Sequence, residues 1–364
     1  MRVVTIGAGA IGTATALRLR QAGAEVVHVA ATAPRDTLSA HSFSWANGID
    51  EGSEAYWHLS LEALAAHRRL AAETDPAWLG TGGNLHWAAD PAGEESLATA
   101  AKGYRALDYP VRELTTAQAL ELEPGLRLDD AVGPIRFYPD DVFLHTDLML
   151  DAVARAATGL GVRQRFGEPV AGIAADGRGV RLASGEVVGA DAVVCCAGRG
   201  NAELLAGLGI TLPLLAPGSP RRLTHGLMVR TTPVEAGVRR VVHAPHLSIR
   251  PASGGALMLH CHDLDWLLNE GADPGELAER VVSRLPGVLP SAGGARVASY
   301  LAAVRPVPVD GMTIVGPVAE GSAVSVVATH SGVTLAAVLA EVVVGDLVGR
   351  PHPLADGFRL SRFG

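Results

Sequence analysis

The stretch VVTIGAGAIGTATALRLRQAGAEVVHVA, residues 3–30, sets the architecture expected for this chain. Apolar runs predict strands at residues 3–6 and 25–29, and residues 11–22 carry apolar side chains at helical spacing between them. The turn that joins the first strand to the helix follows the pattern G-x-G-x-x-G and contains Gly7, Gly9 and Gly12. This order of elements is typical of a dinucleotide-binding unit, in which the helix N-terminus faces a pyrophosphate.

Each residue of the turn has an expected task. Gly7 permits the tight turn, Gly9 lets the backbone approach a pyrophosphate, and Gly12 lets the helix pack closely on the strand. Ala10 and Ile11 open the helix between these glycines. We therefore expect all five residues to contribute to a cofactor site.

The residue that closes the second strand is Ala30, at a position where an acidic side chain usually holds the ribose. Alanine cannot accept a hydrogen bond from a ribose hydroxyl. Three interpretations are open at this point. The site could take NADP, with Arg35 near the 2′-phosphate; it could take FAD with one ribose contact missing; or it could be a weakened site.

Composition narrows the class of protein. The chain has 364 residues, of which 48% are hydrophobic and 19% charged, and its formal net charge is −8. This composition is ordinary for an α/β protein, and the absence of a Lys/Arg run argues against a nucleic-acid partner. No uninterrupted apolar stretch reaches membrane-spanning length and no signal-peptide pattern opens the chain, so we expect a cytoplasmic protein.

Cysteine and lysine usage narrows the chemistry. The chain has three cysteines, which fit a reducing compartment, and adjacent Cys195 and Cys196 should be small buried hydrophobes rather than a redox pair. No Cys/His spacing resembles a zinc site, so no metal is expected. Lys102 is the only lysine, and its polar surroundings predict a solvated helix end.

Further along the chain, strand-and-helix patterns alternate with two strand-rich segments. Helices are predicted at 53–74, with Ser53 as the N-cap, and at 147–158. Residues 168–198 predict a meander of short strands, and a hairpin is predicted where VVHAPHLSIR and GALMLHCH flank PASGG. The expected fold class is therefore α/β, a Rossmann-type nucleotide-binding domain with a strand-rich α+β substrate domain inserted in two segments.

We expect the nucleotide-binding domain at 1–78, 140–217 and 300–364, and the substrate domain at 79–139 and 218–299.

Four motifs together indicate a family: GAGAIG (7–12), LSAHSFSWANG (38–48), ADAVVCCAG (190–198), and VRPVPVDGMTIVG (304–316) paired with ATHSGVTLAAVLAEVV (328–343). In this order and spacing, the chain resembles the D-amino-acid oxidase superfamily of FAD-dependent oxidoreductases over nearly its whole length. That superfamily includes glycine oxidase, sarcosine oxidase and D-amino-acid dehydrogenase. The resemblance implies that the nucleotide-binding domain holds FAD.

The resemblance also implies which residues face the cofactor. Beyond the glycine turn and Ala30, these are Ser39, His41, Ser42, Trp45, Val170, Ala197, Gly198, Arg305, Ser331, Gly332, Val333 and Thr334. Some relatives carry a flavin-linking histidine where this chain has Trp45, so we expect non-covalent FAD. The amides of residues 332–334 are expected to open a helix whose positive end would stabilise the anionic reduced flavin.

Candidate catalytic residues follow from the same resemblance. Arg305 aligns with the family's substrate-carboxylate arginine, and its planar fork suits a carboxylate. The alternative is a structural ion pair, for which Asp310 is a candidate partner. Arg250 is a second candidate, or else a surface arginine beside a hairpin turn. Three histidines lie on strands or loops that the family points at the flavin, where a neutral imidazole could accept an amine proton: His246, His260 and His330.

The implied function is FAD-dependent oxidation of a C–N bond in an amino acid or secondary amine, by hydride transfer to flavin N5 and hydrolysis of the imine. The alternatives are oxidation of a 2-hydroxy acid or other C–O substrate, and a non-catalytic flavoprotein with a weakened cofactor site. The electron acceptor would be oxygen or another acceptor. Met258 stands where sarcosine oxidases carry an oxygen-activating lysine, so oxidase and dehydrogenase activity both stay open.

Overall fold

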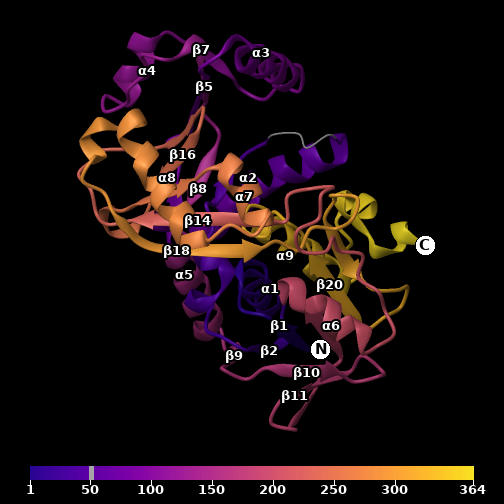
Figure 1. Ribbon diagram of the computed structural model, residues 1–364. Helices are drawn as coiled ribbons and strands as arrows, with labels where there is room; N and C mark the ends of the chain where they lie inside the picture. Colours follow the sequence, from indigo (N-terminus) through magenta and orange to yellow (C-terminus); the bar gives the residue numbers. More distant parts are fainter. Residues whose placement is uncertain (49–52) are drawn as a thin grey trace.

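The computed structural model describes residues 1–48 and 53–364, in which two large sheets dominate (Figure 1). The first sheet has the strand order β19 (Ile314–Pro317), β20 (Val324–Ala328), β13 (Ala192–Cys195), β1 (Arg2–Ile6), β2 (Glu25–Ala30) and β9 (Arg163–Phe166). Its neighbouring strands are parallel, except that β19 pairs antiparallel with β20. The carboxyl ends of the parallel strands therefore meet at one edge, the usual ligand edge of a doubly wound sheet.

This parallel sheet is covered on both faces, which explains its nearly continuous apolar strands. One face packs against a helical layer, with Val3 and Val194 in its core, and the other face buries Val4 and Val193. The helical layer consists of α1 (Ala10–Gln21), α2 (Glu54–Thr74), α5 (Thr146–Gly159) and α9 (Ala336–Leu347). The opposite face carries β10 (Val170–Ile173), β11 (Gly179–Leu182), β12 (Val187–Gly189) and α6 (Asn201–Ala206).

Several predictions for this half are confirmed. Helix α2 follows Ser53, whose hydroxyl accepts a hydrogen bond from the Tyr56 amide at 3.2 Å. The predicted meander is the antiparallel β10–β11–β12 sheet. Cys195 and Cys196 are free and buried, and burial raises the pKa of the Cys196 thiol to about 12. Both thiols are therefore inert hydrophobic groups.

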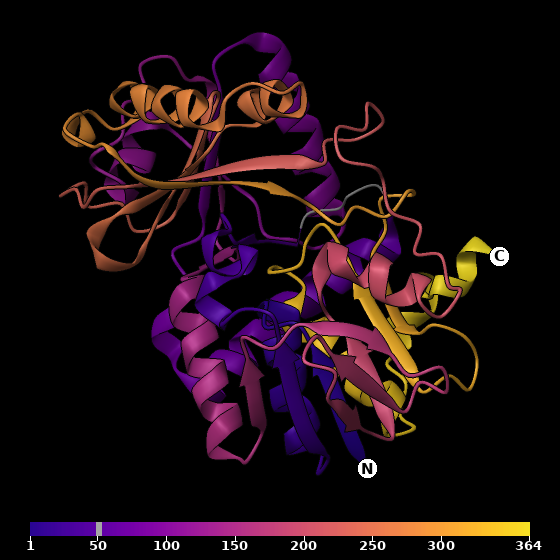
Figure 2. The same ribbon diagram turned by 60° about the horizontal axis from the view of Figure 1, so that its bottom comes forward.

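The second sheet forms the other half of the molecule, seen above the parallel sheet in Figure 2. Its strand order is β18 (Val297–Val304), β14 (His225–Thr231), β17 (Leu257–His260), β16 (Leu247–Pro251), β15 (Val241–Ala244), β5 (Asn84–Ala88), β7 (Val132–Tyr138) and β6 (Arg112–Leu114). The predicted hairpin is the pair β16–β17. Because β18 ends at Val304, the domain boundary proposed at residue 300 falls inside a strand.

Helices and a small sheet complete this half. The helices α7 (His262–Asn269) and α8 (Pro274–Val288) pack on one face of the second sheet. Helix α3 (Pro91–Ala106) contacts β5 and β7, and α4 (Thr116–Leu122) contacts β6 and β7. Lys102 is exposed on α3, as predicted. A short sheet links the two halves through β3 (Trp45–Ala46), β8 (Val142–Leu144) and β4 (Leu79–Gly80).

One row of opposed residues runs across the second sheet. Its members, from β18 to β7, are Leu301, Met228, His260, Ser248, His243, His86 and Arg136. Directly opposed residues share one face of a sheet, so these side chains all point the same way. Their chain neighbours Leu227, Leu259, Ile249 and Val242 point to the other face, into the core under α7 and α8. The sheet therefore has one apolar face and one face rich in histidine.

Within the described residues, no helix combines the length and apolar character needed to cross a membrane.

A pH dependence of stability follows from the buried histidines. Burial lowers the pKa of His67 to about 4, while its Nε2 bonds the carbonyls of Val333 and Thr334. Below pH 6.5 the unfolded chain gains a proton that folded His67 excludes, so stability falls as the pH drops from 6.5 toward 4. His67→Gln keeps a donor without this titration, and we expect it to reduce the loss of unfolding free energy between pH 7.5 and 5 by about 1–2 kcal/mol.

Urea unfolding of both proteins at the two pH values measures this difference. His58 is exposed on the same helix, and His58→Gln is the matched control. Equal pH dependence in wild type and His67→Gln would show that His67 is not held neutral.

Candidate functional site

A cavity of about 1030 Å³ lies where the carboxyl ends of the parallel sheet meet the histidine-rich face of the second sheet. Most residues singled out in the sequence line it: Gly7, Gly9, Ala10, Ile11, Ala30, Ser39, His41, Ser42, Trp45, Val170, Ala197, Gly198, His260, Arg305, His330, Ser331, Gly332, Val333 and Thr334. Gly12, His246 and Arg250 are not among the residues that line it. The structure therefore brings together segments more than 300 residues apart in the chain.

The glycine turn after β1 forms one end of the cavity. Gly7 has a φ of +102°, and a Cβ there would lie 2.5 Å from the Cys196 carbonyl oxygen. A Cβ on Gly12 would collide with the Gly7 carbonyl oxygen, so Gly12 acts through packing rather than by facing the cavity. The Ala10 N–H donates to the Ser39 hydroxyl at 3.0 Å, which draws the loop after β2 over the turn.

The turn before α9 follows β20 of the parallel sheet and lines the cavity, and it differs from the prediction. Residues 330–335 form a turn, and α9 begins only at Ala336. The reason is the local bonding: Leu335 N–H donates to the Ser331 carbonyl four residues back, but Ala336 N–H donates to the Val333 carbonyl only three residues back, which interrupts the helical series. Within the described residues, the amides of Gly332, Val333 and Thr334 have no protein acceptor. Such a run of free N–H groups forms an anion-binding concavity.

Arg250 is not a surface arginine and does not reach the cavity, which corrects both readings of it. Its side chain is 2% exposed, and its guanidinium donates to the carbonyl oxygens of Phe43, Ser42 (2.9 Å) and Pro251 (2.6 Å). Burial lowers its pKa to about 9, so it stays protonated at neutral pH. The physical reason is the strand alternation, which points Arg250 at the loop 42–43 that lies on the sheet.

Loss of this contact should loosen the cavity wall. We expect Arg250→Met to lower the unfolding free energy by about 2–3 kcal/mol, because buried carbonyls lose their donors. Retention of the cofactor should fall with it, since residues 42–45 line the cavity. Chemical denaturation and cofactor content after gel filtration measure the two effects. Arg155→Met, at a side chain that is 69% exposed, is the control, and equal behaviour of the two variants would contradict the role.

The three histidines predicted to be catalytic lie in different places, and only two of them line the cavity. His246 lies in the turn between β15 and β16, away from the cavity, and its carbonyl accepts hydrogen bonds from Arg284 (2.8 Å) and Cys261. His330 lines the cavity, and its ring stacks on Tyr56 with a centroid distance of 6.2 Å. His260 lines the cavity from β17 and lies 2.7 Å from the carboxylate of Asp265 on α7. Of the three histidines predicted to be catalytic, His260 and His330 therefore line the cavity.

Arg305 follows β18 and also contacts Asp265. Its Nη2 lies 3.3 Å from Asp265 Oδ2, whereas the suggested partner Asp310 pairs with Arg362 at 2.7 Å. The backbone opposite is Gly226, where a Cβ would come within 2.8 Å of the guanidinium carbon. The missing side chain at Gly226 thus makes room for Arg305 over β14, with part of the guanidinium open to the cavity.

Asp265 is fully buried and accepts three hydrogen bonds. Besides Arg305 and His260, the Leu227 amide donates to its Oδ1 at 2.7 Å. Burial alone would raise its pKa, but the His260 hydrogen bond and the Arg305 charge lower it, so the carboxylate is ionised at neutral pH.

The sequence analysis missed several cavity residues, namely Phe43, Met228, His243 and His262, and it missed Asp265, which is buried behind His260 and Arg305. Met228 and His243 belong to the same row as His260, and period-two alternation along β14–β17 is the signal that could have found them. Asp265 carries a weaker signal, an acidic residue within the apolar pattern of α7. His260, His262 and Asp265 also form a group whose ligand atoms lie within 4.8 Å of one another, although no metal was expected.

The Trp45 side chain is held by Asp141, a residue that does not line the cavity. Its indole N–H donates to Asp141 Oδ2 at 2.7 Å, and its ring lies 4.2 Å from that of His243. Burial raises the pKa of Asp141 to about 7, although hydrogen bonds from Tyr109 and Trp45 act in the opposite direction. Position and orientation of the Trp45 ring are thus fixed by a buried acid.

Ala30 lines the cavity at the end of β2, next to Pro169 and Val170. Arg35 does not lie free for a 2′-phosphate, because it forms a bidentate pair with Asp151 on α5. We expect Ala30→Glu to lower the dissociation constant of FAD about tenfold, through one charge-assisted hydrogen bond to the ribose. Titration of apoprotein with FAD measures this, with Ala31→Glu as control. Unchanged affinity would mean that another group already holds the ribose.

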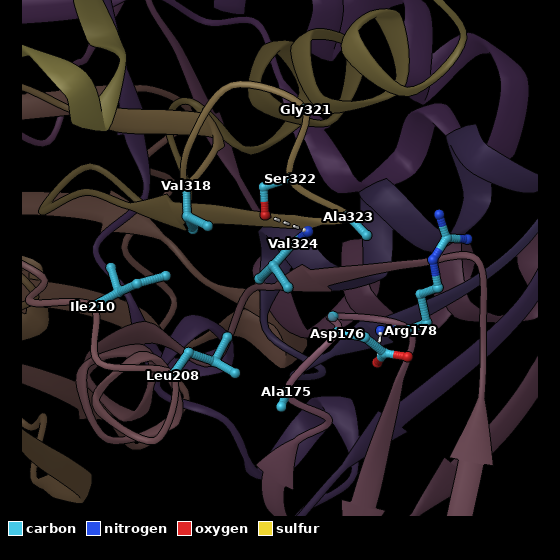
Figure 3. A pocket seen from close by; sticks show the side chains of 11 residues that line it. Ala175, Asp176, Arg178, Leu208, Ile210, Val318, Gly321, Ser322, Ala323 and Val324 are labelled. Carbon is cyan, nitrogen blue, oxygen red and sulfur yellow. Dashed lines mark hydrogen bonds between the residues drawn. The ribbon is translucent and has the colours of Figure 1, made fainter.

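A second, smaller hollow of about 260 Å³ lies between the β10–β11 turn and the β19–β20 hairpin (Figure 3). Its polar groups cap turns: the Arg178 amide donates to the Asp176 carboxylate, and the Val324 amide donates to the Ser322 hydroxyl (Figure 3). Because these polar groups are used in the turns, no set of reactive side chains points together into this hollow among the described residues. The larger cavity is therefore the candidate active site.

Comparison with known proteins agrees with this geometry. The family model for FAD dependent oxidoreductases matches residues 2–345. N-methyl-L-tryptophan oxidase from Yersinia pestis (strain Pestoides F) is 27% identical over 213 residues, which make up 57% of this chain and 56% of that protein, so the match spans about half of each.

Solved structures share the whole fold. Glycine oxidase from Geobacillus kaustophilus superposes with a TM-score of 0.82 at 22% identity, covering 99% of both chains. L-amino acid deaminase from Proteus vulgaris, without its specific insertion sequence, gives 0.84 at 19% identity and covers 99% of this chain and 93% of its own.

Proposed function

Because the chain belongs to the family of FAD-dependent oxidoreductases, we propose that it binds FAD non-covalently and oxidises a C–N bond of an amino acid or secondary amine. The observation that carries the proposal is the pairing of two features in one cavity. A turn with three free amides supports a flavin, and Arg305 supports a substrate carboxylate beside it.

The residues present fit FAD. Gly7 and Gly9 bring the backbone of the turn to the cavity wall, and the N-terminus of α1 directs its dipole to the place where a pyrophosphate would lie. Val170, Ala197 and Gly198 would line the adenosine side. The amides of residues 332–334 would face the flavin N1/C2=O end, and FAD supplies the hydride acceptor.

The chain's own residues would bind and orient the substrate. Arg305 would hold the carboxylate through two parallel hydrogen bonds, which fixes the α-carbon relative to the cofactor. His67 holds the carbonyls of Val333 and Thr334 on the far side of the turn, so that the turn amides stay directed at the cavity. The imine product would leave the cavity and hydrolyse in water.

Purified protein tests the proposal directly. It should be yellow, release FAD on heating, and bleach under anaerobic conditions with at least one member of a panel of amino acids and N-methyl amino acids. Reoxidation by oxygen or by an artificial acceptor then separates oxidase from dehydrogenase activity. Protein that cannot be loaded with FAD, or FAD that no amine reduces, would overturn the proposal. Bleaching by 2-hydroxy acids alone would favour the C–O alternative.

Substitution of Arg305 tests the carboxylate contact. We expect Arg305→Leu to raise KM for a carboxylate substrate by about 10²-fold, because a charge-assisted bidentate pair is lost. Steady-state kinetics over a range of substrate concentrations measures this. Arg284→Leu removes a comparable arginine–aspartate pair outside the cavity and should leave KM unchanged. An unaltered KM in Arg305→Leu would remove this residue from the role.

A further inference from the structure

We infer that Asp265, His260 and Arg305 form one unit that selects zwitterionic amino acids over 2-hydroxy acids, with His260 as the acceptor of the ammonium proton. In this unit Asp265 is a positioning residue, because it acts through His260 and Arg305. The inference rests on the proposed function and specifies its substrate class.

The geometry joins the three side chains through one carboxylate. Oδ2 of Asp265 lies 2.7 Å from His260 Nε2 and 3.3 Å from Arg305 Nη2, and Oδ1 is taken by the Leu227 amide. Because the ionised carboxylate accepts, the tautomer of His260 that could take a proton carries its hydrogen on Nε2 and its lone pair on Nδ1. Within the described residues Nδ1 has no partner, and His260 lines the cavity. A basic nitrogen is therefore available to a substrate beside Arg305.

The charges around this unit determine what it binds. Arg305 contributes one positive charge and Asp265 one negative charge, so the pair is neutral before substrate arrives. The other titratable groups facing His260 are His262, whose ring lies 4.4 Å away, and His243 across Ser248. Burial lowers the pKa of His243 well below its ordinary value, so His243 is neutral, whereas His262 is exposed to solvent.

A neutral pair of opposite charges complements a zwitterion. The substrate carboxylate would bind Arg305, and the ammonium group would lie beside His260 and the Asp265 charge. A 2-hydroxy acid brings a carboxylate without the ammonium group, so it would weaken the Arg305–Asp265 pair without compensation. The unit therefore favours an amino acid by electrostatic balance.

Atoms and electrons balance in the proposed transfer of the ammonium proton to His260. One ammonium N–H breaks, its proton forms a new N–H bond at His260 Nδ1, and the nitrogen keeps the electron pair. The imidazolium is stabilised by Asp265 through Nε2–H. The α-carbon then loses its hydride, and with it two electrons, to the oxidised cofactor of the proposed function. The nitrogen lone pair completes an iminium group, which water hydrolyses to a 2-oxo acid and ammonium.

Asp265→Asn tests the unit with little change of shape. At neutral pH we expect kcat for an amino acid to fall on the order of 10²-fold, with recovery at high pH where the substrate amine is already neutral. Selectivity for the amino acid over the matched 2-hydroxy acid should fall at least about tenfold. The non-reactive probe acetate, followed through the flavin spectrum, should bind about tenfold more tightly, because Arg305 loses its competing partner.

Tighter acetate binding is the readout that a merely structural role would not produce. Asp263→Asn, at an exposed position on the same helix, is the matched control. His260→Gln, for which FAD content and circular dichroism verify folding, should lower kcat and remove the acid limb of the kcat/KM profile while leaving acetate affinity unchanged. The His260→Gln variant therefore still tests the inference if Asp265→Asn does not fold.

Three outcomes would overturn the inference. One is weaker acetate binding in Asp265→Asn, another is an unchanged pH profile in His260→Gln. The third is loss of wild-type activity on chelation, which would assign His260, His262 and Asp265 to a metal ion instead. Failure of the proposed function is distinguishable from these results, because wild-type flavin would then not be reduced by any amino acid.

Discussion

The buried guanidinium of Arg250 joins the two halves of the site. It extends from the hairpin of the second sheet and donates to the carbonyl oxygens of Ser42 and Phe43, which belong to the loop that follows the nucleotide-binding unit. Because a buried charge requires partners, the loop cannot move away from the sheet without a large cost. One wall of the cavity depends on this contact, since the same loop carries Trp45, and the hydroxyl of its Ser39 accepts a hydrogen bond from the Ala10 amide in the glycine turn.

The chemistry arises where an edge of one sheet meets a face of another. The parallel sheet offers backbone groups at its carboxyl ends, which suit a phosphate-bearing cofactor. The second sheet offers side chains of one row, and its alternation keeps the opposite row in the core under α7 and α8. Asp265 contacts both His260 and Arg305, so in the proposed reaction the binding of a carboxylate and the movement of a proton would share one counter-charge. Neither sheet alone would bring these groups together.

How much the sequence predicts depends on the range of the interaction. The glycine turn could be predicted from the sequence, because the backbone packs so closely at Gly7 and Gly12 that a Cβ would collide with it. Asp265 and His243 were not, because their roles depend on strand register and on a helix folded back across the sheet. The places of His246 and Arg250 were not predicted either, because His246 lies in the turn before β16, and Arg250 shares the face of Ser248 but is covered by the loop at residues 42–43. The start of α9 was predicted four residues early, because helical spacing continues through the preceding turn.

The midpoint potential of the bound flavin tests the central claim most directly, namely that the free amides of residues 332–334 and the surrounding cavity prepare a cofactor to accept two electrons from an amino acid. The measurement uses FAD-loaded protein, reduced slowly with a reference dye of known potential. The account predicts a potential more positive than that of free FAD, because the turn stabilises the anionic reduced form. A potential equal to or more negative than that of free FAD would contradict it.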